Sequence, residues 1–188
     1  MQENLKLGFI LLLVSAIAAG VLAVVNDITK PIIAERERLK AIEAYQEIIP
    51  EADDFEDFSS DEMKSLRANH PKIEKVVIAK KDGNNLGYLV TSNGGGYGGN
   101  ITVISGIIDG KIVQIKILKH KETPNIGAKV ENPSFQEQFK DMPTDNLINV
   151  VTSKKSPNEI EKISGSTVSS KGVVAAVNAA LEWHKEAQ

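Results

Sequence analysis

Residues 101–118, ITVISGIIDGKIVQIKIL, decide the fold of this chain. Two runs rich in isoleucine and valine flank Asp109-Gly110, a pair typical of the tight turn between two antiparallel strands. The pattern of Lys111–Ile117 is interpreted as an alternation of solvent-facing and buried side chains. The stretch therefore predicts a β-hairpin with one face in a core.

The neighbouring segments extend this sheet toward the N-terminus. Val76–Ile78 and Gly87–Val90 flank Asp82-Gly83-Asn84-Asn85, a second hairpin signature. Before it, the acidic stretch Glu51–Asp61 is predicted to be a solvated loop. Apolar residues recur at helical spacing from 31 to 49, which predicts an amphipathic helix that begins at Pro31, either separate or continuous with the segment before it.

The segments that follow the hairpin are mainly helical. Pro133–Phe139 predicts a short helix, Leu147–Val151 a short strand, and Val168–Lys185 a long helix. One face of that last helix carries Val173, Val177, Ala180, Leu181 and His184. The fold class predicted is α+β, with an antiparallel sheet and flanking helices.

The N-terminal segment Leu7–Val25 is uncharged and almost wholly apolar. As a helix it would extend roughly 28 Å, near the hydrocarbon thickness of a bilayer. A cleaved signal peptide is the alternative, but the apolar run continues well past the small residues at 15–18. We therefore expect a membrane anchor in residues 1–30, in contact with lipid, and one domain in 31–188. Counting Lys and Arg on each side places that domain in the cytoplasm, although the rule loses force before a large domain.

Composition excludes several classes of function. The 188 residues carry a formal net charge of −3 and no basic stripe, which argues against nucleic-acid binding. The chain has no cysteine and three widely separated histidines, so no metal site is expected.

Three loops contain the residues suited to a ligand. Gly94–Gly99 has five glycines in six residues, which suits either close backbone approach to a ligand or a flexible linker. His120–Gly127 contains Pro124, which stiffens either a ligand-gripping loop or a surface turn. Ser164–Ser170 places hydroxyls at a helix start, where they suit either a phosphate or ordinary capping.

Taken together, these loops resemble those of one family, the G subunit of the Rnf electron-transport complex. It belongs to a wider group of FMN-binding domains that includes the C subunit of the sodium-translocating NADH:quinone reductase. SGSTVSS at 164–170 resembles the S-G-A-T-x-T-S flavinylation motif, HKETPNIG at 120–127 resembles H-x-E-T-P-G-L-G, and Tyr97-Gly98-Gly99 fits the glycine loop. Ser166 stands where the family has alanine, and Asn125 where it has glycine, a substitution that a left-handed backbone tolerates.

The resemblance implies that FMN is bound covalently, through its phosphate, to Thr167. Ser164, Gly165 and Ser166 would form the surrounding loop. Glu122 and Thr123 would hold the isoalloxazine side, and Gly98 and Gly99 would allow close approach.

The resemblance also implies the function and the partners. The protein would carry electrons within an ion-translocating NAD:ferredoxin oxidoreductase complex, with no catalytic residues and no independent activity. Other membrane and redox subunits would be its neighbours, and a flavin transferase would attach the FMN. The relatives place the domain on the extracytoplasmic side of the cell membrane. Two alternatives stay open, a cofactor-free assembly subunit and a stand-alone flavinylated extracytoplasmic reductase.

Overall fold

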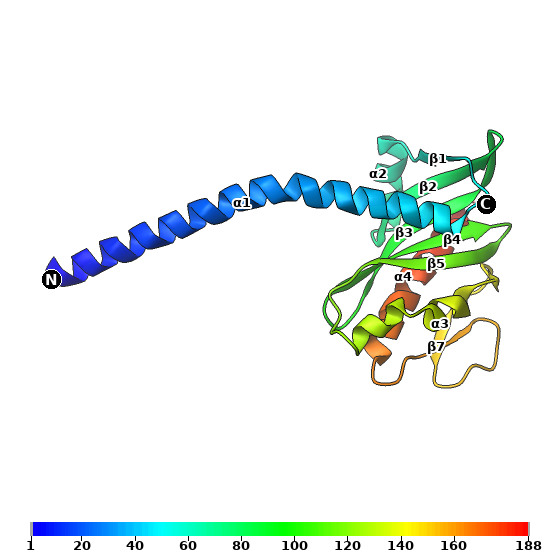
Figure 1. Ribbon diagram of the computed structural model, residues 1–188. Helices are drawn as coiled ribbons and strands as arrows, with labels where there is room; N and C mark the ends of the chain where they lie inside the picture. The colour runs from blue at the N-terminus through cyan, green and yellow to red at the C-terminus, as the bar shows by residue number, and fades with distance from the viewer. Residues whose placement is uncertain (1, 188) are drawn as a thin grey trace. The chain divides into compact units, whose positions relative to one another are not determined.

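The computed structural model describes residues 2–187 and confirms an α+β fold with an antiparallel sheet and flanking helices (Figure 1). Its contacts divide the chain into two units, Met1–Ile42 and Glu43–Gln188. The second unit contains the sheet and all three loops.

The helix α1 spans Gln2–Ile48 without interruption. Of the two alternatives for the helix predicted from Pro31, the one continuous with the N-terminal segment is confirmed, because Pro31 lies inside α1. Proline removes one intrahelical hydrogen bond there, and the helix continues on both sides of it. Within residues 2–187, α1 is the one helix long and apolar enough to cross a membrane, with a window of mean hydropathy 2.7 in Lys6–Ile48.

Six strands form one antiparallel sheet in the order β1-β2-β3-β4-β5-β6. They are β1 (Asp54–Asp57), β2 (Ile73–Lys81), β3 (Asn84–Gly95), β4 (Asn100–Ile108), β5 (Lys111–Lys119) and β6 (Met142–Pro143). Both predicted hairpins are confirmed. Their turns have positive φ at both central residues, 53° and 77° at Asp82-Gly83 and 48° and 69° at Asp109-Gly110, as a two-residue hairpin requires.

The strand β5 departs from simple alternation. Its buried isoleucines are Ile112, Ile115 and Ile117, so the first two lie three residues apart. A bulge in β5 accounts for this spacing, because Gly106 of β4 pairs with Gln114 and Ile107 pairs with Ile112, which leaves Val113 as an extra residue on β5. The predicted period of two therefore holds only from Gln114 onward.

The prediction of a loop over Glu51–Asp61 is wrong. The Phe55 ring of β1 packs against the Tyr45 ring, with centroids 5.7 Å apart. Two acidic side chains of this edge strand, Glu56 and Asp57, form ion pairs with lysines of β2. The helix α2 (Ser60–Asn69) follows, and its start is a capping box between Ser59 and Glu62. That sequence signal was present and was missed.

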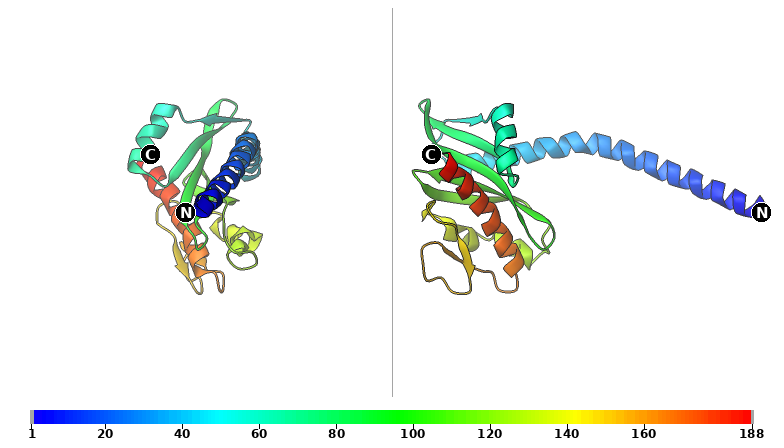
Figure 2. Two further views of the ribbon diagram at one scale, coloured as in Figure 1. Left: turned by 90° about the vertical axis from the view of Figure 1, so that its left-hand side faces the viewer. Right: turned by 180° about the vertical axis from the view of Figure 1, so that it is seen from behind.

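The helix α4 (Thr167–Glu186) covers one face of the sheet (Figure 2). Gly172 of α4 lies directly on the backbone of β3, since a Cβ there would come within 2.8 Å of the Gly95 carbonyl oxygen. The last turn of α1 covers the other face, where Ile48 occupies the space that a side chain at Gly106 would need. In this turn and the residue after it, Ala44, Tyr45, Ile48 and Ile49 are each at most 4% exposed.

Shorter elements complete the domain. The predicted helix at 133–139 is present as α3 (Pro133–Gln136) and the 3-10 helix η2 (Glu137–Phe139), preceded by η1 (Gly127–Glu131). The strand predicted at 147–151 is β7 (Asn149–Val151), which pairs in parallel with β8 (Glu159–Glu161), a strand that was not predicted.

Candidate functional site

The N-terminus of α4 is the first component of the site. Thr167 is its first residue, and Ser166 precedes it as the N-cap without capping the helix through its side chain. Gly165 has a φ of 77°, a left-handed conformation that turns the chain into the helix. The first N–H groups of a helix carry partial positive charge, so this 20-residue helix presents a position that favours an anion.

The hydroxyls around this N-terminus have different surroundings. Ser170 holds the loop in place, because its Oγ accepts from the Ile163 N–H and donates to the Ser166 carbonyl. Ser164 is exposed, and Thr167 is half-buried. The Ser166 Oγ is buried, and no hydrogen-bond partner for it exists among residues 2–187.

The loop after β5 is the second component. Asn125 has a φ of 61°, which confirms the left-handed conformation expected for this position. The backbone N–H of Glu122 donates to His120 Nδ1 at 3.0 Å, so the other ring nitrogen carries the proton. That nitrogen, Nε2, lies 3.0 Å from the Glu131 carboxylate. The loop is therefore fixed to the helical segment that follows it.

The Glu122 side chain joins all three loops. One carboxylate oxygen accepts from the Gly98 N–H at 2.8 Å, and the other accepts from the Ser169 hydroxyl. Glu122 is only 6% exposed. Segments separated by more than 20 residues in sequence thus meet at a single buried carboxylate.

The glycines near this carboxylate leave room for it. A Cβ at Gly96 or Gly127 would overlap a Glu122 carboxylate oxygen, and one at Gly98 would overlap the Lys121 carbonyl. Gly99, with a φ of 131°, and Gly165 have no atoms within 4 Å of the corresponding position. The glycine loop is therefore packed against the protein at Gly96 and Gly98 and open at Gly99. It is also a hairpin connection within the sheet, closed by a 2.8 Å hydrogen bond from the Gly96 N–H to the Gly99 carbonyl.

A cavity of about 490 Å³ lies where these loops meet. Its lining residues are Tyr97, Glu122, Thr123, Ile126, Gly127, Gly165, Ser166, Thr167, Val168 and Ser169. Three of them are large apolar side chains exposed to solvent, Tyr97 at 80%, Ile126 at 53% and Val168 at 49%. The cavity thus has a polar end at the start of α4 and an apolar rim.

Five of the eight residues predicted for the site line this cavity: Glu122, Thr123, Gly165, Ser166 and Thr167. Gly98 does not line the cavity, but its N–H donates to Glu122, which does. Gly99 and Ser164 are exposed and lie outside the lining. The prediction did not include Tyr97, Ile126, Gly127, Val168 and Ser169. Of these five, Ser169 could have been predicted from sequence, because it lies in the same motif as Thr167.

The cavity is chemically suited to FMN. The uncapped start of α4 and the unpartnered Ser166 hydroxyl suit a phosphate, and the apolar rim suits a flat aromatic ring. In the described part of the chain, no group of three or more His, Asp or Glu side chains could hold a metal ion.

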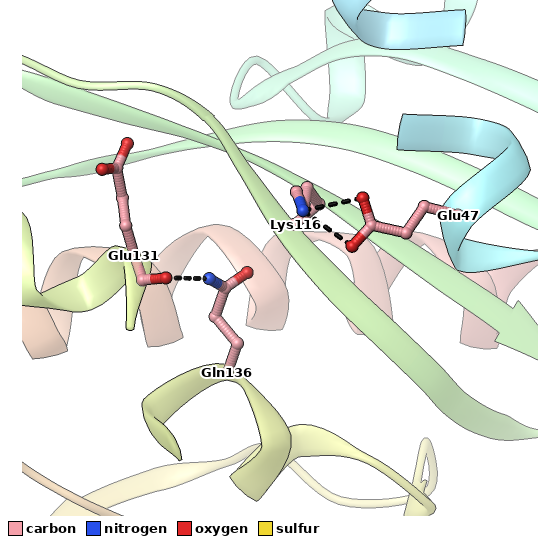
Figure 3. A network of polar contacts seen from close by, with 4 residues as sticks. All are labelled: Glu47, Lys116, Glu131 and Gln136. Carbon is pink, nitrogen blue, oxygen red and sulfur yellow. Dashed lines mark hydrogen bonds and ion pairs between the residues drawn. The ribbon is translucent and has the colours of Figure 1, made fainter. Parts of the chain in front are cut away.

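A second, more polar cavity of about 310 Å³ lies over β5. Figure 3 shows four of its lining residues, Glu47, Lys116, Glu131 and Gln136. On one side of it, Lys116 donates to both carboxylate oxygens of Glu47 at 2.7 Å. On the other, the Gln136 amide donates to the Glu131 carbonyl at 2.7 Å. The first pair ties the last turn of α1 to β5, and the second ties the end of α3 to the end of η1.

Two protein-family models match two separate parts of the chain. The FMN-binding domain family matches residues 96–182, which contain all three loops from Gly96 onward. The RnfG N-terminal region matches residues 2–48, the extent of α1.

Similar proteins match along nearly their whole length. The G subunit of the Na⁺-translocating ferredoxin:NAD⁺ oxidoreductase complex of Acetobacterium woodii is 37% identical over 190 residues, which cover 96% of this chain and 91% of the relative. The G subunit of the ion-translocating oxidoreductase complex of Methanosarcina acetivorans is 31% identical, with 97% and 95% covered.

A solved structure shares the fold. The crystal structure of Shewanella oneidensis NqrC superposes with a TM-score of 0.51 at 20% identity, over 57% of this chain and 54% of the other. Sequence identity of this extent to the two G subunits establishes the relationship, and this chain belongs to the RnfG family, the G subunits of ion-translocating oxidoreductase complexes.

Proposed function

We propose that this protein carries electrons through FMN attached covalently to Thr167, as a subunit of a membrane-bound, ion-translocating ferredoxin:NAD⁺ oxidoreductase complex. The observation that carries the proposal is the position of Thr167. It is the first residue of α4, lines the cavity, and follows an N-cap that leaves the helix start uncapped by a side chain. Relatives named as the G subunits of such complexes support the assembly.

The residues of the cavity have distinct roles in this proposal. A phosphodiester on the Thr167 oxygen keeps one negative charge, which the first N–H groups of α4 stabilise. Ser164, Gly165 and Ser166 shape the loop before it, and Glu122 and Thr123 form the opposite wall with Gly98 and Gly99 beside them. The exposed rim of Tyr97, Ile126 and Val168 provides apolar surface for the ring. FMN, when bound, supplies one- or two-electron transfer.

The proposal includes a location for the domain. Residues 1–30 anchor the chain in lipid through the apolar part of α1, and 31–188 lie on the extracytoplasmic side of the cell membrane. A covalent bond suits that side, because FMN lost from the protein would not be replaced from the cytoplasm. A flavin transferase attaches the FMN, and neighbouring redox subunits exchange electrons with it.

Attachment at Thr167 can be tested on a denaturing gel. The full chain is produced together with a flavin transferase, and flavin fluorescence of the denatured band is measured. We expect Thr167→Ala to abolish the fluorescence, whereas Ser164→Ala, a matched control at an exposed position of the same loop, keeps it. A Thr167→Ala band as fluorescent as the parent would place the attachment elsewhere.

A further inference from the structure

We infer that Glu122 is a positioning residue, whose carboxylate ties the glycine loop to the first turn of α4 and so fixes Thr167 in place, without itself contacting the flavin ring. The inference rests on the proposed attachment of FMN to Thr167. It concerns how the protein without cofactor prepares that hydroxyl for the flavin transferase.

The hydrogen bonds of Glu122 are already used within the protein. Its Oε1 accepts from the Gly98 N–H at 2.8 Å, and its Oε2 accepts from the Ser169 hydroxyl. At 6% exposure the carboxylate is removed from solvent, and burying a charged group is costly unless such bonds satisfy it. Each carboxylate oxygen thus already has a donor within the protein, one in the glycine loop and one in α4.

The surrounding backbone is built around this carboxylate. Gly96 in the glycine loop and Gly127 at the start of η1 both lack a Cβ where one would overlap its oxygens. A Cβ at Gly127 would also come within 2.9 Å of the Ser169 hydroxyl oxygen. Two segments therefore make room for one side chain, so the Glu122 carboxylate is packed between them at the wall of the cavity.

The backbone of Glu122 is held from the opposite side. Its N–H donates to His120 Nδ1, and the other nitrogen of that ring contacts Glu131. Since both the main chain and the side chain of Glu122 are fixed, movement of the glycine loop or of α4 must break a hydrogen bond to this residue. Ser169 lies two residues after Thr167, so its bond to Glu122 fixes the first turn of α4, whose backbone carries Thr167.

Three single variants separate positioning from flavin contact. Glu122→Ala removes both bonds, and Ser169→Ala removes only the bond to α4. Glu122→Gln keeps both, because its amide oxygen can accept from the Gly98 N–H and its amide nitrogen can donate to the Ser169 oxygen. The full chain is incubated with flavin transferase and FAD, and the rate of flavin attachment is measured with the visible spectrum and midpoint potential of the product.

We expect Glu122→Ala to lower the attachment rate on the order of tenfold or more, the size associated with losing hydrogen bonds to a charged group. Ser169→Ala lowers it less. The double variant, with both Glu122→Ala and Ser169→Ala, attaches flavin no more slowly than Glu122→Ala alone, since both changes break the same connection. Glu122→Gln restores the rate to within about threefold of the parent and leaves the spectrum and midpoint potential unchanged.

Other results would overturn the inference. If Glu122→Gln shifted the midpoint potential or spectrum while Glu122→Ala was flavinylated at the parent rate, Glu122 would contact the ring. Additive losses in the double variant would also contradict a shared role. If Glu122→Ala does not fold, as circular dichroism would show, the other two single variants still test the inference. Slower flavin attachment with Ser169→Ala than with Glu122→Gln supports positioning, and the reverse order contradicts it. Failure of the proposed function is distinguishable, because then the parent itself would carry no attached flavin.

Discussion

Ser166 and Thr167 are adjacent hydroxyl residues in very different surroundings. Thr167 is half-buried at the edge of the cavity, whereas the Ser166 residue is 4% exposed and its hydroxyl has no hydrogen-bond partner within residues 2–187. The sequence predicted the cluster of hydroxyls but did not assign separate roles to its serines. Burial depends on the helix packing against loops more than 40 residues away, and no local pattern encodes it.

We therefore expect Ser166→Ala to stabilise the protein without cofactor. A buried hydroxyl without a partner costs about 1–3 kcal/mol, and alanine removes that cost with little change in volume. The free energy of unfolding, measured by chemical denaturation of the full chain in detergent, should rise by about 1 kcal/mol. Ser164→Ala, at an exposed position of the same loop, is the control and should change nothing. A decrease with Ser166→Ala would mean that the hydroxyl has a stabilising partner.

His184 should make stability depend on pH. It is 5% exposed in α4 beside the rings of Tyr88 and Trp183, and burial lowers its pKa below the usual 6.5. The unfolded chain then binds a proton at a higher pH than the folded one, so protonation favours unfolding. Stability from this group is present above pH 6.5 and is lost as pH falls from about 6.5 toward the folded pKa.

The comparison with His184→Gln isolates this contribution, since glutamine does not titrate. Free energies of unfolding of the two proteins are measured between pH 7.5 and 5, values chosen to bracket the ordinary His pKa of about 6.5. The difference between parent and variant should shrink as pH falls. A constant difference would mean that His184 is protonated equally in both states.

At the scale of elements, the sequence predicted what local chemistry determines. Both Asp-Gly hairpins are present, because that pair adopts the positive φ angles the turn needs. The strand β1 was missed, because its pairing with β2 and the lysines beside its acidic side chains are set by tertiary structure. The roles of the glycines were also not predictable, since Gly96, Gly98 and Gly127 are defined by neighbours distant in sequence.

Gly172 illustrates a tertiary requirement that overrides helix propensity. In an isolated helix, alanine is more favourable than glycine by about 1 kcal/mol. Here a Cβ would come within 2.8 Å of the Gly95 carbonyl oxygen and 3.0 Å of its carbon, both backbone atoms. We expect Gly172→Ala to destabilise the protein by about 1–3 kcal/mol, the usual cost of overpacking.

The measurement is again the free energy of unfolding, with flavin attachment as a second readout. Displacing the start of α4 from the glycine loop should slow attachment at Thr167 as well. Lys171→Ala, at the exposed neighbouring position, is the control and should change stability by less than about 0.5 kcal/mol. A Gly172→Ala protein more stable than the parent would show that α4 can shift without cost.

For the whole molecule, the decisive question is where the globular domain begins. Composition suggested residue 31, whereas contacts divide the chain between Ile42 and Glu43. Ile32, Ile33 and Leu39 are exposed, but Tyr45, Ile48 and Ile49 are at most 4% exposed against the sheet. The three exposed residues therefore add nothing to the described core, whereas the three buried ones are part of it.

Truncation tests this boundary, because the buried residues after it contribute a large part of the free energy of unfolding. Burying each large apolar side chain contributes about 1.5–3 kcal/mol, so losing Tyr45, Ile48 and Ile49 removes roughly 5–9 kcal/mol. Because a domain of this size is stable by only about 5–15 kcal/mol, a chain that starts at 50 should be largely unfolded. A chain that starts at 43 should unfold cooperatively and still accept flavin at Thr167. Cooperative, flavinylated protein from both truncations would show that the last turn of α1 is dispensable for the domain.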